Sequence, residues 1–161
     1  MIHLYIGSHM EPLNILLILL GLLIVATLAG FVWQNRQGSI SRSTASDLPP
    51  DVPLELVERG SIITLLQFSG PFCSYCQAMR GVLGREAATH DGAVAHREID
   101  ITDYPELTRT LRVNQTPTTF LVTSSGHIVS RIHGAAKPPI VANEVATALS
   151  HRKAQSDEYL I

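Results

Sequence analysis

The stretch that decides the fold is Phe68-Ser69-Gly70-Pro71-Phe72-Cys73-Ser74-Tyr75-Cys76. It begins where an apolar, β-branched run at residues 62–68 ends, and such a run is typical of a central strand buried on both faces. The Gly-Pro turn breaks this strand. Apolar side chains at three- and four-residue spacing then predict a helix from Cys76 to about Ala88, with the cysteine pair on its first turn.

The elements after this helix alternate between the two periodicities. Short apolar runs predict strands at residues 93–99, 118–122 and 128–132, and the last two are expected to form an antiparallel hairpin. Helical spacing predicts helices at residues 104–111 and 139–149. This order indicates an α/β domain in which a mixed sheet is flanked by helices.

The composition excludes several classes of protein. Lys and Arg total 12 against 14 Asp and Glu, so the chain is not a strongly basic nucleic-acid-binding protein. Two cysteines are too few for a disulfide-stapled miniprotein or a four-thiolate zinc ribbon. Of the 21 residues from Leu13 to Trp33, 17 are apolar. The rest of the 161-residue chain has the length of one soluble domain.

The apolar block predicts one membrane-spanning helix. Ile15 to Trp33 is a run of 19 residues without a charge, and at about 1.5 Å per residue a helix of this length crosses the hydrocarbon core. One alternative is a buried core helix, but such a helix normally carries a polar stripe. The other is a cleaved signal peptide, whose apolar region is usually only ~7–15 residues long and follows basic residues.

Two arginines bear on the orientation of this helix. Arg36 and Arg42 follow the apolar run, and no Lys or Arg precedes it, so the positive-inside rule favours a cytoplasmic C-terminal domain. The rule weakens when a long domain follows, and the extracytoplasmic orientation therefore stays open.

The chain is expected to have five segments. Gly7-Ser8-His9-Met10 resembles a cloning remnant, so no function is assigned to residues 1–10. The expected segments are a short N-terminal segment (1–11), a transmembrane helix (12–33), a Ser- and Pro-containing linker (34–53), the soluble domain (54–151) and a polar C-terminal tail (152–161).

Cys73 and Cys76 are the only cysteines, and their position predicts redox chemistry. Unpaired N–H groups at a helix start favour an anion, so the Cys73 thiolate is expected to be stabilised and its pKa to lie below about 8.5. Cys76, one turn further along, would attack a mixed disulfide formed by Cys73 and release the substrate. Cys73 is thus the expected nucleophile and Cys76 the resolving thiol.

The pair has two other interpretations, a metal site and a pair of inert buried thiols. Two thiolates need two further ligands to hold a metal ion, and His90 and His96 lack ligand-like spacing. We therefore expect no metal, and no cofactor besides a redox-active Cys73–Cys76 disulfide. Two buried, inert thiols are the other interpretation, although two cysteines within four residues after a loop make a poor packing pattern.

The same residues resemble the thioredoxin superfamily over about Leu54 to Leu149. The segment 68–76 is similar to that family's active-site strand and turn, with a Phe where a Trp commonly stands, and Thr116-Pro117-Thr118 resembles its cis-proline loop, 44 residues after the nucleophile. The resemblance implies a thioredoxin-like fold, a cis proline, and a substrate chain that pairs with the backbone before it. The substrate-binding residues implied in this way are Phe72, Ser74, Tyr75, Thr116 and Pro117.

The sequence departs from that family at two positions near the cysteines. Thioredoxins often bury an Asp six residues before the nucleophile as a proton acceptor for the second cysteine, and this chain has Gln67 there. A Lys often partners that Asp, and the matching residue here is His96. An amide does not accept a proton, so the source of general-base help for Cys76 is open.

The sequence thus predicts a membrane-anchored thiol-disulfide oxidoreductase. It is expected to act as a monomer on protein thiols and disulfides, with an unidentified redox partner and without nucleic acid. In the cytoplasm it would reduce disulfides, and in the opposite orientation it would reduce or help form those of exported proteins, including cytochrome-maturation substrates. The alternative is a tethered binding module, either a soft-metal carrier or a peptide-binding scaffold, without redox turnover.

Overall fold

The centre of the soluble unit is strand β2 (Ile63–Ser69), in which every residue is buried. β2 pairs in parallel with β3 (Val94–Asp100) and antiparallel with β4 (Thr118–Thr123). β4 pairs antiparallel with β5 (Ile128–His133) as the predicted hairpin. The sheet is therefore mixed, and its central strand has the continuous apolar run that burial on both faces requires.

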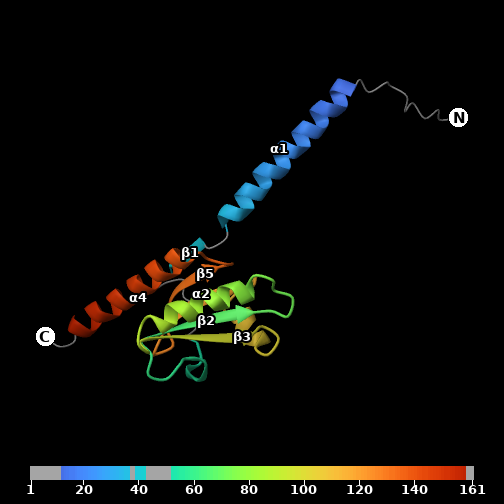
Figure 1. Cartoon of the computed structure of the whole chain (residues 1–161). Coiled ribbons are helices and arrows are strands. Elements are labelled where there is room, and N and C mark those ends of the chain that lie inside the picture. Colours follow the sequence, from blue (N-terminus) through green and yellow to red (C-terminus); the bar gives the residue numbers. More distant parts are fainter. Residues whose placement is uncertain (1–11, 37–38, 43–51, 159–161) are drawn as a thin grey trace. The chain divides into compact units, whose positions relative to one another are not determined.

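The computed structural model describes residues 12–36, 39–42 and 52–158 (Figure 1). Side chains are described for all of these except residues 33–36, 42 and 152–158. The chain forms two units by its contacts, Met1–Arg36 and Gln37–Ile161. Three predicted features lie outside the described residues: the N-terminal segment 1–11, residues 43–51 of the linker, and residues 159–161 of the tail.

Helices cover both faces of the sheet, as predicted. α2 (Cys76–Ala88) and α4 (Pro138–Glu158) pack on one face, and α2 extends along β2 and β3 in Figure 1. The core under these helices contains Ile63, Leu65, Met79, Leu83, Leu121, Ile132, Val141 and Val145. The core of the other face, next to the short helices η1 (Leu54–Leu56) and α3 (Pro105–Thr110), contains Leu56, Leu66, Phe68, Ile99, Leu111, Phe120 and Val122.

The predicted linker contains a strand that the sequence did not indicate. Ser39–Arg42 forms β1, which pairs antiparallel with β5 and gives the sheet the order β1-β5-β4-β2-β3. Ile40 lies opposite Ile132 and packs against the core under α2 and α4. Val52 is also part of the fold, since it is 2% exposed and its N–H donates to the carbonyl of Gly126 at 3.0 Å. One apolar residue between two serines is too weak a pattern to predict an edge strand.

Helix α4 is longer than the helix predicted at residues 139–149. It continues to Glu158 and so includes most of the predicted polar tail. The apolar spacing ends near Leu149, but the following residues include Arg, Lys, Ala and Gln, which have high helix propensity. A helix already nucleated by its packed half gains one hydrogen bond for each residue added.

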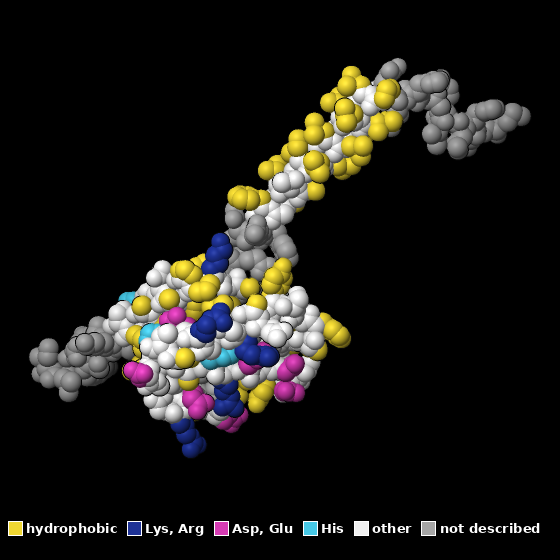
Figure 2. All heavy atoms as spheres, in the orientation of Figure 1, with side chains coloured by type: hydrophobic (Ala, Val, Ile, Leu, Met, Phe, Trp, Pro, Cys, Tyr) yellow, Lys and Arg dark blue, Asp and Glu magenta, His cyan; other side chains and the backbone are white. Residues whose placement is uncertain are grey.

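Helix α1 (Pro12–Arg36) begins at a proline, which fits the first turn because the missing N–H would have no partner there. Its window Pro12–Val32 has a mean hydropathy of 3.0, and this helix is long and apolar enough to cross a membrane. None of the window is buried, unlike a core helix, and Figure 2 shows apolar side chains along it. The hydroxyl of Thr27 donates to the carbonyl of Leu23 at 2.7 Å, which satisfies this polar group within the helix.

Arg131 of β5 ties the hairpin to the segment that precedes the proline loop. Its Nη2 donates to the carbonyl of Leu111 at 2.5 Å, and its guanidinium lies 4.5 Å from the ring centroid of Phe120. Partial burial is the main cause that lowers the Arg131 pKa, with a smaller contribution from the charge of Arg112. The group stays charged at neutral pH, so it combines a charge-assisted hydrogen bond with a cation–π contact.

Arg131→Met is expected to destabilise the soluble unit by about 1–3 kcal/mol, because it keeps an apolar stem but loses the hydrogen bond and the cation–π contact. Thermal unfolding of the full chain in detergent measures the effect. The matched control is Arg109→Met, since Arg109 is exposed and pairs with the exposed Glu106. Equal melting temperatures for the two variants would contradict the role assigned to Arg131.

Candidate active site

The two cysteines are joined in a disulfide, with their Cα atoms 5.4 Å apart. The sequence predicted that both cysteines lie on the first turn of the helix. Helix α2 instead begins at Cys76, so this prediction is wrong for Cys73, which precedes the helix by three residues. A tight turn holds it there, because the Cys73 N–H donates to Gly70 O at 3.2 Å and the Cys76 N–H donates to Cys73 O at 3.3 Å. The Gly-Pro loop thus forms a turn of its own before the helix starts.

The two sulfur-bearing residues differ in exposure. Cys76 is only 4% exposed, whereas Cys73 is half-buried. A partner molecule therefore reaches Cys73 more readily than Cys76, which agrees with their expected roles as nucleophile and resolving thiol. Around the pair, Phe72 is 99% exposed, Tyr75 is 51% exposed, and Ser74 is also exposed.

The Thr116-Pro117 peptide bond is cis, as the resemblance implied. Pro117 is buried, and its carbonyl accepts a hydrogen bond from the Gly134 N–H at 2.9 Å. Gly134 has φ 71°, a conformation that favours glycine. A Cβ at Gly70 would lie 3.6 Å from the Thr116 hydroxyl oxygen, so the proline loop touches the loop that carries the cysteines. The fold thus brings together the two segments predicted to form the site.

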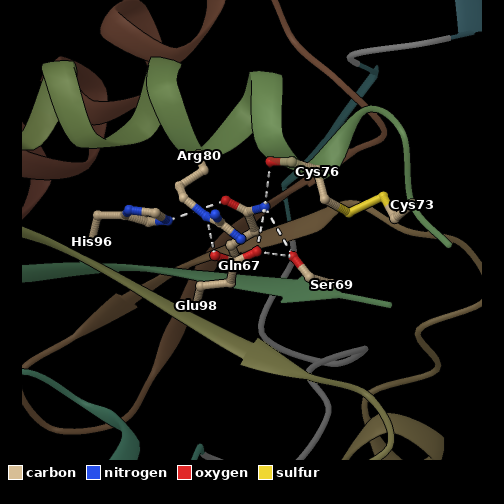
Figure 3. A network of polar contacts seen from close by, with 7 residues as sticks. All are labelled: Gln67, Ser69, Cys73, Cys76, Arg80, His96 and Glu98. Carbon is tan, nitrogen blue, oxygen red and sulfur yellow. Dashed lines mark hydrogen bonds and ion pairs between the residues drawn. A yellow bond between two sulfur atoms is a disulfide. The ribbon is translucent and has the colours of Figure 1, made fainter. Parts of the chain in front are cut away.

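Gln67 is fully buried behind the cysteine pair and is the centre of a polar network (Figure 3). Its Nε2 donates to the Cys76 carbonyl and to Ser69 Oγ, both at 3.0 Å, and lies 3.4 Å from Glu98 Oε1. Its Oε1 lies 3.1 Å from His96 Nε2. A carbonyl and a carboxylate only accept hydrogen bonds, so the amide nitrogen must face them and the amide oxygen must face His96.

This orientation fixes the proton on His96. Since Gln67 Oε1 is an acceptor, His96 must donate through Nε2. Burial is the main cause that lowers the His96 pKa, the charge of Glu98 opposes it, and the charge of Arg80 adds to it. His96 is therefore neutral at neutral pH, with its proton on Nε2, and it orients the Gln67 amide.

Glu98 is the acidic member of this network. It lies opposite Gln67 in the parallel β2–β3 register, accepts a hydrogen bond from the Ser69 hydroxyl through Oε1, and pairs with Arg80 Nε through Oε2. Partial burial alone would raise the Glu98 pKa. Hydrogen bonds from Arg80 and Ser69, together with the charge of Arg80, outweigh burial and hold that pKa below its usual range. Glu98 is therefore ionised at neutral pH.

A cleft of about 570 Å³ opens beside the disulfide. Both cysteines line it, together with Ser69, Arg80, Glu98 and Asp100. The predicted substrate-binding residues are not among its lining residues: Phe72, Ser74, Tyr75, Thr116 and Pro117. The disulfide is therefore bordered both by a polar cleft and by the exposed aromatic side chains next to it in sequence.

Sequence reasoning singled out Gln67 and His96 but missed Glu98, Ser69 and Arg80. The signal for Glu98 was present, because alternate residues of a strand face the same side and Glu98 is two residues after His96. The signal for Arg80 was also present, since it is one helical turn after Cys76 on the same helix. Within the described residues, no three His, Cys, Asp or Glu side chains are grouped closely enough to hold a metal ion.

Solved thioredoxins share this fold. Chloroplastic thioredoxin z is 20% identical over 60% of this chain and 86% of its own, with a TM-score of 0.52. Thioredoxin-2, described as a component of malaria parasite protein secretion machinery, is 14% identical over 56% of this chain and 87% of its own, with a TM-score of 0.50. At these identities the similarity concerns the fold alone. Among curated protein sequences, none matches this chain significantly.

The sequence family model provides the assignment. The model described as Thioredoxin matches residues 54–146, which is more than half of the chain and contains both cysteines and the cis proline. Two cysteines that close an intramolecular disulfide, one of them accessible, can perform thiol-disulfide exchange. The chain belongs to the thioredoxin family and is, at the level of that family, a thiol-disulfide oxidoreductase.

Proposed function

We propose that this protein is a membrane-anchored thiol-disulfide oxidoreductase that exchanges disulfides with protein substrates. The observation that carries the proposal is the pairing of an accessible Cys73 with a buried Cys76. Phe72, which is 99% exposed, and Tyr75 flank the accessible sulfur with aromatic surface. Exposed aromatic side chains of this kind are typical of protein contacts, which supports a protein substrate over a small thiol.

In one turnover, the two thiols supply both electrons that reduce the substrate disulfide. In the reduced protein, the Cys73 thiolate attacks one sulfur of a substrate disulfide, and the other substrate sulfur leaves as a thiolate. Cys76 then attacks Cys73 Sγ in the mixed disulfide, which releases the second substrate sulfur and closes the Cys73–Cys76 disulfide. The substrate gains two electrons and the protein loses two, so a separate redox partner must reduce the protein again.

Exchange activity tests this function directly. The reduced full-length protein in detergent is mixed with a protein that carries an accessible disulfide, and both are sampled by acid quenching and thiol labelling. We expect loss of two thiols from the enzyme for each substrate disulfide reduced. A reduced pair that persists in the presence of excess protein disulfides would contradict the proposal and favour the binding module without redox turnover.

The apolar helix α1 supports membrane anchoring, and the arginines that follow its apolar run support a cytoplasmic soluble domain. In that compartment glutathione and thioredoxin systems keep dithiols reduced, so the protein would act as a reductase of disulfides near the membrane. In the opposite orientation the same pair would act on disulfides of exported proteins.

Thiol labelling distinguishes the two orientations. We expect that in intact cells a membrane-impermeant maleimide leaves Cys73 unlabelled, and that it labels Cys73 after lysis and mild reduction. Cys73→Ser is the control, because the remaining thiol of Cys76 is on a residue only 4% exposed and should label slowly in the native protein. Labelling of Cys73 in intact cells after mild reduction would place the domain outside the cytoplasm, and recovery of the protein in the soluble fraction would contradict the anchor.

A further inference from the structure

Resolution of the mixed disulfide requires that the Cys76 thiol lose its proton, and Gln67 cannot accept it. We propose that Glu98, on the neighbouring strand β3, accepts this proton through the hydroxyl of Ser69. The proposal deepens the proposed function and rests on it, because it names the group that activates the second thiol. In this chain the acid is supplied by the strand next to the one that carries Gln67.

The contacts connect Glu98 to the backbone of Cys76. Ser69 Oγ donates to Glu98 Oε1 and accepts from Gln67 Nε2, and the same Nε2 donates to the Cys76 carbonyl. Figure 3 shows this chain of contacts from Cys76 through Gln67 and Ser69 to Glu98. The carbonyl carries no proton, so the thiol proton must take the path that the cleft provides, which Cys76, Ser69 and Glu98 all line. A proton can pass from the Cys76 thiol through solvent in this cleft to the Ser69 hydroxyl and on to the carboxylate, without crossing the apolar core.

The neighbours of Glu98 keep its carboxylate ionised and leave one oxygen directed at Ser69. Arg80 on α2 pairs with one carboxylate oxygen, which leaves the other oxygen directed at Ser69. His96 on the same strand bonds to the Gln67 amide through Nε2 and is not among the residues that line the cleft, so it lies off the proposed proton path. Asp100, the other acid of the cleft, bonds to the N–H and hydroxyl of Thr102 instead. Of the two acids that line the cleft, Glu98 is thus the one whose hydrogen bond to Ser69 leads toward the cysteine pair.

In the mixed disulfide the Cys76 thiol gives its proton, through solvent in the cleft, to Ser69 Oγ while Ser69 gives its own proton to Glu98 Oε1. The Cys76 thiolate attacks Cys73 Sγ, the bond between Cys73 and the substrate sulfur breaks, and the substrate leaves as a thiolate. Because Arg80 disfavours the protonated carboxyl, Glu98 holds the proton only briefly and returns it to the leaving thiolate or to water.

A purely structural role is the competing explanation, since the Arg80–Glu98 pair also links α2 to β3. A structural role would lower stability or slow both exchange steps to a similar degree. A proton acceptor for Cys76 would affect the second step alone and would change its dependence on pH. The two explanations are separated by measuring each step in one reaction.

The test is single-turnover oxidation of the reduced full chain by an aromatic disulfide that releases a coloured thiolate in each step. The first phase reports attack by Cys73 and the second reports resolution by Cys76. For the wild type we expect a second phase that is nearly independent of pH above the Glu98 pKa. For Glu98→Gln we expect an unchanged first phase and a second phase slowed roughly tenfold or more near pH 6, rising with pH as the thiolate forms.

Three further variants make the result decisive. Glu98→Asp is expected to recover most of the rate and the flat profile, because it restores a carboxylate. Ser69→Ala is expected to slow the second phase while the acid is still present. Glu86→Gln makes the same change on α2 at a residue that pairs with His90, and it should match the wild type.

Failure of the inference is distinct from failure of the proposed function. A wild type without a second phase would contradict the function itself. A Glu98→Gln protein with the wild-type second phase and pH profile would overturn the inference alone, as would an Asp100→Asn protein that showed the predicted loss in place of Glu98→Gln. If Glu98→Gln does not fold, the Ser69→Ala profile decides, and a wild-type profile there overturns the inference.

Discussion

Cys76→Ser is expected to accumulate covalent complexes with protein substrates, and Cys73→Ser is expected to lose exchange by roughly a thousandfold or more. Cys73 is the accessible sulfur, so without Cys76 it still attacks a substrate disulfide but no buried thiol is left to release the product. Without Cys73, the remaining sulfur belongs to a residue 4% exposed, and substrates do not reach it. The two serine variants therefore fail at different steps.

The measurement is a membrane preparation from cells that produce each full-length variant, quenched with acid and separated without reductant. Bands that disappear on reduction should be abundant for Cys76→Ser and absent for the double variant Cys73→Ser/Cys76→Ser. Ser74→Ala is the matched control, since it changes an exposed residue between the sulfurs and leaves both thiols in place. A Cys76→Ser protein that traps no partner, with a wild type that is purified with stoichiometric metal, would support the soft-metal carrier and contradict the oxidoreductase.

Most helices and strands were predictable because the local sequence patterns agree with the elements that form. The apolar run of β2, the turn after it and the helical spacing after Cys76 each indicate the element that forms there, and the boundaries of α2 match the prediction. The hairpin of β4 and β5 follows from two apolar runs separated by a Gly-containing turn. In each of these elements the burial pattern of the fold is the one that periodicity indicates.

Features that depend on partners far away in sequence were not predictable in this way. β1 has a single apolar residue and is defined by its pairing with β5, about 90 residues later. Glu98 belongs to the site because the parallel register places it beside Gln67, and a strand sequence alone does not specify its register. The sequence alone shows that Gln67 stands where related proteins often have an acid. That Glu98 lies beside Gln67 is known only from the pairing of β2 with β3.

Gln67→Glu is expected to destabilise the oxidised protein by about 3 kcal/mol at neutral pH, because Gln67 is the centre of the polar network behind the cysteines. The change removes the amide N–H donors that bond to the Cys76 carbonyl and Ser69, and places a second carboxylate beside Glu98. At about 4 °C per kcal/mol, the value between those of domains of about 100 and about 150 residues, the melting temperature should fall by about 10 °C. An acid at this position is therefore expected to be poorly tolerated while Glu98 is beside it.

The sign of the pH dependence identifies the cause of this loss. An unfolded Glu has a pKa of about 4.3, and burial beside the Glu98 carboxylate raises the folded-state pKa of the new carboxyl above that value. Below about pH 4.3 the new carboxyl is protonated in both states and only the loss from the missing N–H donor remains, whereas the deficit grows as pH rises from there through the folded-state pKa. Thermal unfolding of the full chain in detergent between pH 4 and 8 measures it, with Gln115→Glu as the exposed control of equal charge. If the two variants melt alike across this range, Gln67 is not the donor on which this network depends.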